Sequence, residues 1–103
     1  MRIALVCAVV LAASPLGAAA KDTAARNLAS GCAICHGTGG HAATSAVNSL
    51  AGLPQSEFIA RMAGFRNGTR PATVMHQIAK GYTDQQIEQL AAWFAAQKRQ
   101  GAR

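Results

Sequence analysis

The sequence predicts an all-α fold of three to four helices. Apolar residues recur at helical spacing over residues 58–65 and again over residues 87–94. No stretch shows the alternation of apolar and polar residues that marks a half-buried strand. The chain has 103 residues, and because domains usually span about 100–200 residues, we expect a single domain.

The first helix is expected to begin at Asp22 or Thr23, since both residue types are good N-caps. It would run past Leu28 into the segment 32–36, which contains the two cysteines described below. Residues 37–52 are rich in Gly, Ser, Thr, Ala and Asn and show no periodicity. They are therefore predicted to form a loop.

Two further helices have recognisable ends. Ser56 is the expected N-cap of the second helix, which should stop at the Asn-Gly pair of residues 67–68. The last helix is predicted with the most local support, because Thr83 and Gln86 have the spacing of a capping box. Trp93 on this helix is expected to pack in the core.

The first 20 residues resemble a secretory signal peptide that is cleaved. Arg2 is followed by an apolar run from Ile3 to Ala13, then by small residues that end in Ala18-Ala19-Ala20. The alternative is a retained membrane anchor, but an apolar run of this length is shorter than the roughly 20 residues that span a bilayer. We expect export to the periplasm and no membrane span after cleavage.

Cleavage would leave residues 21–103 as the mature domain and would remove Cys7. Two cysteines then remain, Cys32 and Cys35. The mature domain is short of large apolar side chains, because Ala and Gly dominate and the chain contains only five aromatic residues. Such a small core needs additional stabilisation.

Residues Cys32-Ala33-Ile34-Cys35-His36 form a C-x-x-C-H motif, the signature of c-type haem attachment. Two sulfurs about one helical turn apart can bond to the two vinyl groups of one haem, and the adjacent His36 can bind the iron. We therefore expect one covalently attached haem c, which would also supply the missing apolar mass. A redox dithiol is an alternative, but the chain lacks a βαβ pattern.

A zinc site formed by Cys32, Cys35, His41 and His76 is a further alternative, although these histidines lack the usual H-x₃₋₅-H spacing. We expect His41 to be solvated.

A second axial ligand would complete the iron site of an electron carrier. We favour Met75, which follows Pro71 after a break containing glycine. Met62 lies in the periodic second helix and is expected to fill the core. His76 is the rival ligand, since imidazole also binds iron.

The chain has ten Lys and Arg residues against four Asp and Glu, for a net charge of +6. Lys98 and Arg99 are expected near the end of the last helix, where cations stabilise the helix dipole. Arg61, Arg66, Arg70 and Lys80 are expected on the solvated surface. The alternative is that Arg66 or Arg70 pairs with a haem propionate. Nucleic-acid binding has only the net charge in its favour, so we expect no such partner.

The mature domain resembles the small class I c-type cytochromes in its haem motif, its methionine 39 residues later, and the segment from Thr83 to Phe94. Residues 65–82 more narrowly resemble the cytochrome subunit of flavocytochrome c sulfide dehydrogenase. The resemblance implies that Cys32 and Cys35 hold the haem and that His36 and Met75 are its axial ligands. It also implies an FAD-containing flavoprotein partner that oxidises sulfide.

The sequence departs from the class I pattern at one point. These cytochromes usually have a Gly-Pro pair after the haem motif, whose carbonyl orients the proximal histidine, but no proline lies between His36 and Pro54. The group that orients His36 is therefore open.

The expected function is non-catalytic electron transfer. A free soluble single-haem shuttle of the c4, c5 or c553 type, serving other redox proteins, is the main alternative. A ligand-binding haem sensor would need an open sixth position, which Met75 argues against. A haem peroxidase would need distal acid and base groups, for which the four acidic residues and three histidines offer no convincing set.

Overall fold

The computed structural model describes residues 16–99, in which all of the regular secondary structure is helical and no strand occurs. In chain order the elements are α1 (Leu16–His36), the 3₁₀ turn η1 (Thr38–Gly40), α2 (Gln55–Asn67), α3 (Met75–Lys80) and α4 (Asp84–Ala95). The prediction of an all-α fold is confirmed. Residues 1–15, with Cys7 and most of the predicted leader, lie outside the described residues.

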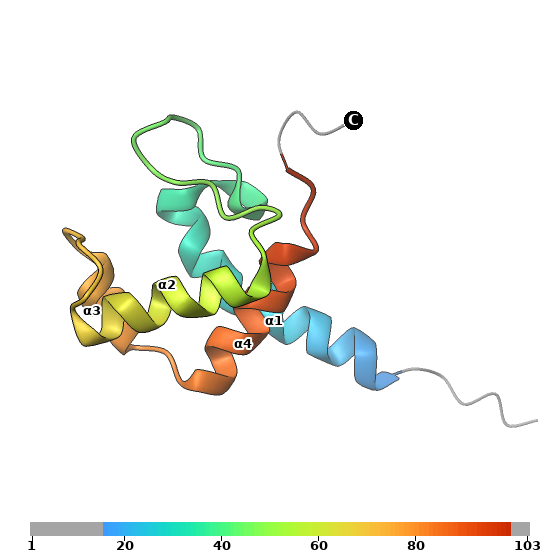
Figure 1. Ribbon diagram of the computed structural model, residues 1–103. Coiled ribbons are helices and arrows are strands. Elements are labelled where there is room, and N and C mark those ends of the chain that lie inside the picture. Colours follow the sequence, from blue (N-terminus) through green and yellow to red (C-terminus); the bar gives the residue numbers. More distant parts are fainter. Residues whose placement is uncertain (1–15, 100–103) are drawn as a thin grey trace, which may run out of the picture.

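Helix α1 begins at Leu16 rather than at Asp22 or Thr23, so the predicted start was wrong. Alanine has the highest helix propensity of all residues, and the three alanines of residues 18–20 favour a helix that extends toward Leu16. The predicted cleavage point after Ala20 therefore falls inside α1. In Figure 1 the first turns of α1 project away from the other helices.

Helix α2 starts at Gln55 with Pro54 as its N-cap, so Ser56 is not the cap that was predicted. The restricted φ of proline suits a helix start, and the Pro54 carbonyl accepts a hydrogen bond from the Phe58 amide at 3.0 Å. The predicted end is confirmed, since Gly68 follows Asn67 in the left-handed conformation at φ 80°.

The capping box of α4 is confirmed in both directions. The Thr83 hydroxyl accepts from the Gln86 amide, and the Gln86 side chain accepts from the Thr83 amide. Helix α4 ends at Ala95, so Lys98 and Arg99 lie beyond its last turn and the predicted dipole role was wrong. Arg99 instead donates to the Gly52 carbonyl of the 37–53 loop.

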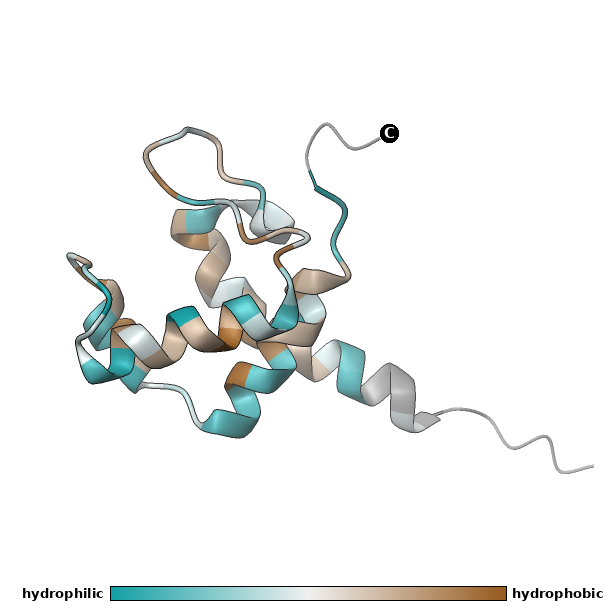
Figure 2. Ribbon diagram, viewed as in Figure 1, coloured by the Kyte–Doolittle hydropathy of each residue, from teal (hydrophilic) through white to brown (hydrophobic). Residues whose placement is uncertain are grey.

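The core lies where α4 meets α1 and α2. The Phe58 and Phe94 rings stack with centroids 5.7 Å apart, and Trp93 packs edge-on against Phe94. In Figure 2 hydrophobic residues of α2 and α4 gather where these helices cross. Among the residues whose burial the structure describes, eleven apolar residues are buried, and five of them are alanines: Ala25, Ala29, Ala51, Ala79 and Ala91.

No helix within residues 16–99 combines the length and the apolarity needed to cross a membrane.

Candidate haem site

A cavity of about 410 Å³ lies between the end of α1, the loop after it, α2 and the segment that leads into α3. In Figure 1 the end of α1 and the segment before α3 flank the space above α2. The residues on its wall that bear on ligand binding are Cys32, Cys35, His36, Asn48, Arg61, Met62, Phe65, Arg70, Met75 and Tyr82. This volume falls within the usual range for ligand pockets, about 300–1,000 Å³.

The last turns of α1 bring the C-x-x-C-H motif to this wall. Cys32 is half-buried and Cys35 is exposed, and neither thiol is in a disulfide. Burial raises the pKa of the Cys32 thiol. Burial also raises the pKa of the Tyr82 phenol, and the neighbouring Cys32 adds to the effect. Cys32, Cys35 and His36 all line this one cavity, whose wall is largely apolar.

The backbone carbonyl of Asn48 orients His36. Its oxygen lies 2.6 Å from Nδ1 of the His36 ring. Since a carbonyl only accepts, Nδ1 carries the hydrogen and Nε2 keeps its lone pair for a metal ion. The Asn48 carbonyl thus orients the histidine, as the carbonyl of the Gly-Pro pair usually does in class I cytochromes.

Three hydrogen bonds fix the loop that contains Asn48. The Gly40 carbonyl accepts from the amides of Leu50 at 2.8 Å and Ala51 at 3.2 Å, and the Ala42 amide donates to the Ser49 hydroxyl at 3.0 Å. The predicted loop is confirmed, with the addition of η1. It is an ordered segment that holds the acceptor for His36.

His41 belongs to the same loop, and its predicted solvation was wrong. Its Nδ1 lies 3.1 Å from the Thr38 carbonyl oxygen, and its Nε2 lies 2.5 Å from the Lys98 carbonyl oxygen. His41 therefore connects the loop to the segment after α4. Within the described part of the chain, no group of three or more His, Cys, Asp and Glu residues is placed to hold a metal ion, which leaves the zinc alternative without support.

Met75 is the first residue of α3 and lines the cavity. Met62 also reaches the cavity, but it is 5% exposed and belongs to the core cluster. His76 is not on the cavity wall, and its Nε2 donates to the Arg70 carbonyl at 2.6 Å. The structure therefore gives Met75 a position suited to a ligand and His76 a structural contact.

The arginines separate into two groups. Arg66 forms an ion pair with Asp84 at the start of α4 and does not line the cavity, so its proposed pairing with a propionate is not supported. Arg70 does line the cavity, as does Arg61. The interpretation of Arg61 as a solvated surface residue was wrong. Its position one helical turn after Glu57 and next to Met62 was the available indication that its side chain has partners within the protein.

The residues on the wall fit a haem. Two thiols one helical turn apart, an imidazole with a free Nε2 and a thioether share a largely apolar cavity, and two guanidinium groups lie at its edge. This donor set matches a c-type haem with His and Met as axial ligands.

The all-α fold and the C-x-x-C-H motif at a cavity wall define a small c-type cytochrome, an electron-transfer haem protein. The chain belongs to the family of c-type cytochromes that includes the cytochrome subunit of sulfide dehydrogenase. It is 35% identical to that subunit from Chlorobaculum tepidum over 83 residues, which cover 81% of this chain and 74% of the relative.

A second relative is cytochrome c-552 from Acidithiobacillus ferridurans. It is 38% identical over 65 residues, which cover 63% of this chain but only 28% of the relative. No protein-family model matches the chain.

Proposed function

We propose that this chain is a periplasmic electron carrier with one haem c, bound covalently by Cys32 and Cys35 and ligated by His36 and Met75. The hydrogen bond from His36 to the Asn48 carbonyl supports this most directly, because it leaves Nε2 of a residue that lines the cavity free to bind a metal ion. When bound, haem c supplies a one-electron couple. The protein residues position the ligands and exclude water.

We further infer that the electron donor is an FAD-containing flavoprotein that oxidises sulfide. The similarity to a cytochrome subunit of sulfide dehydrogenase supports this partner. In that assembly the flavoprotein binds sulfide and performs the two-electron chemistry, and this chain accepts the electrons one at a time. The chain itself contributes no catalytic residue to sulfide oxidation.

Purification of the protein from its own periplasm at low salt tests this proposal. We expect flavin and haem to copurify at about one flavin per haem, and the haem absorption bands to change to the reduced form when sulfide is added. The Met75→Ala variant in the same strain is the control for electron entry through this haem. Haem that purifies without flavin and is not reduced by sulfide would contradict the partnership. It would favour a free electron shuttle, and cytochrome c-552 would then be the more informative relative.

A further inference from the structure

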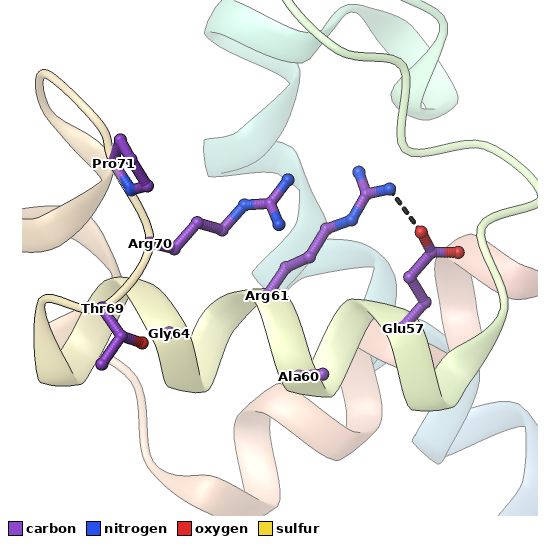
Figure 3. Close-up of a pocket in the computed structure, with 7 residues that line it drawn as sticks. All are labelled: Glu57, Ala60, Arg61, Gly64, Thr69, Arg70 and Pro71. Carbon is purple, nitrogen blue, oxygen red and sulfur yellow. Dashed lines mark hydrogen bonds and ion pairs between the residues drawn. The ribbon is translucent and has the colours of Figure 1, made fainter.

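Two arginines line both the haem cavity and a second, open groove. The groove has a volume of about 470 Å³ and lies between α2 and the segment 69–71. Its residues, drawn in Figure 3, are Glu57, Ala60, Arg61, Gly64, Thr69, Arg70 and Pro71. Arg61 and Arg70 also line the haem cavity, whereas Glu57 lines the groove but not the haem cavity.

Arg70 is held firmly at this junction. Its amide donates to the Gly64 carbonyl at 3.1 Å, its carbonyl accepts from His76, and its guanidinium lies 5.5 Å from the centre of the Phe65 ring. A Cβ on Gly64 would approach Arg70 Cβ to 3.0 Å, so this glycine permits the close packing. The guanidinium is thus positioned before any ligand binds.

The charges at the junction do not balance. Arg61 is paired with Glu57, one helical turn earlier, at 2.5 Å. Arg70 has no ion-pair partner among residues 16–99, where the ion pairs are Arg61 with Glu57 and Arg66 with Asp84. Figure 3 shows the guanidinium groups of Arg61 and Arg70 directed into the same space above α2. Two cations and one carboxylate at the edge of an apolar cavity favour a ligand with anionic groups on one edge.

We propose that Arg61 and Arg70 bind the propionate edge of the haem and that Glu57 sets the reduction potential through Arg61. This inference rests on the proposed haem site. Glu57 competes with a propionate for Arg61 and partly neutralises it. Because Glu57 does not reach the haem cavity, it acts as a positioning residue. The Arg61 and Glu57 side chains are 27% and 46% exposed, so solvent screens their interaction only in part.

The charge of each residue fixes the direction of its effect. The oxidised haem has one more positive charge than the reduced haem, so added positive charge nearby favours reduction. Glu57→Gln leaves Arg61 unopposed and should raise the potential. Arg61→Gln and Arg70→Gln should lower it, since each leaves a propionate less well neutralised.

Redox titration of the purified holoprotein in a double-mutant cycle tests the inference. We expect Glu57→Gln to change the equilibrium constant for reduction about threefold, which is about 28 mV at 59 mV per tenfold for one electron. In the Arg61→Gln background the same substitution should have almost no effect. Arg61→Met completes the same cycle if Arg61→Gln yields no holoprotein. Glu88→Gln, an exposed carboxylate on α4 outside both cavities, is the matched control.

Two outcomes would overturn this inference but leave the proposed function intact. One is a change in reduction potential in Glu57→Gln that is no larger than in Glu88→Gln. The other is an equal effect of Glu57→Gln on the potential with and without Arg61. In both cases the wild-type protein would still show covalent haem and the methionine-to-iron charge-transfer band. A wild type that lacks covalent haem would instead overturn the proposed function, and this inference with it.

Discussion

His36 and Asn48 are twelve residues apart in the sequence, yet Nδ1 of the His36 ring lies 2.6 Å from the Asn48 carbonyl oxygen. The orientation of the proximal imidazole therefore depends on the course of the 37–53 loop. The loop in turn depends on the Gly40 carbonyl, which accepts from both Leu50 and Ala51. A change at Gly40 should therefore alter the orientation of the His36 ring.

Gly40→Ala should disturb both stability and the His36 hydrogen bond. Gly40 has φ 82°, and an added Cβ would lie 2.8 Å from the Ala51 amide nitrogen and 2.9 Å from the Phe94 ring. Backbone strain and overpacking together should lower the free energy of unfolding by about 3 kcal/mol. Denaturant unfolding measures this loss, and NMR of the His36 ring N–H reports the hydrogen bond.

Gly68→Ala is the matched control, because Gly68 has φ 80° with nothing within 4 Å of an added Cβ. It should cost only about 1 kcal/mol. An equal loss in the two variants would show that the packing of the loop against Phe94 contributes nothing.

His76→Ala should weaken the proposed bond between Met75 and the haem iron. His76 donates to the Arg70 carbonyl and so holds the segment that precedes α3. Losing one hydrogen bond of this kind costs about 1 kcal/mol, and we expect the reduced variant to bind carbon monoxide under conditions in which the wild type does not. His76→Gln retains a hydrogen-bond donor, so it should bind less carbon monoxide than His76→Ala. If His76→Ala behaves as the wild type, His76 does not support the ligand.

The wild-type protein should lose stability at alkaline pH through ionisation of Tyr82, and Tyr82→Phe should abolish this loss. Burial raises the pKa of the Tyr82 phenol in the folded chain, so ionisation is easier in the unfolded state, where it occurs near pH 10. The folded state is therefore disfavoured as the pH rises above about 10, and ionisation of the phenol does not change stability well below that value. Denaturant unfolding of both proteins over this range measures the difference, and identical curves would contradict it.

The chain should lose most of its helix when haem cannot attach. Alanines form almost half of the buried apolar residues, and the cavity walls, including Met62 and Phe65, would lose their contacts. Circular dichroism of the Cys32→Ser/Cys35→Ser double variant tests this. Helix content close to that of the holoprotein would show that the polypeptide core suffices.

Features encoded by residues close in the sequence were predictable. The capping box of Thr83 and Gln86 is confirmed because both partners lie within one helical turn. The C-x-x-C-H motif likewise comes to the wall of one cavity, although its chemistry stays a prediction. In both cases the residues concerned are close neighbours on one helical segment, so their relative positions follow from their spacing.

Features that depend on distant backbone groups were not predictable. Asn48 acts through its main-chain carbonyl, so its side chain gives no signal. His41 lies in a Gly-rich loop, which favours solvation, and its contact with the Lys98 carbonyl gives no local signal because Lys98 is 57 residues away. Helix α3, only six residues long, has too few residues to show a period.

The absorption spectrum of the oxidised holoprotein tests the central claim, that Met75 and His36 are the axial ligands of one covalent haem. The wild type should show the sulfur-to-iron charge-transfer band, Met75→Ala should lose it while retaining covalent haem, and Met62→Leu should keep it. A band that survives in Met75→Ala, or disappears in Met62→Leu, would contradict the assignment.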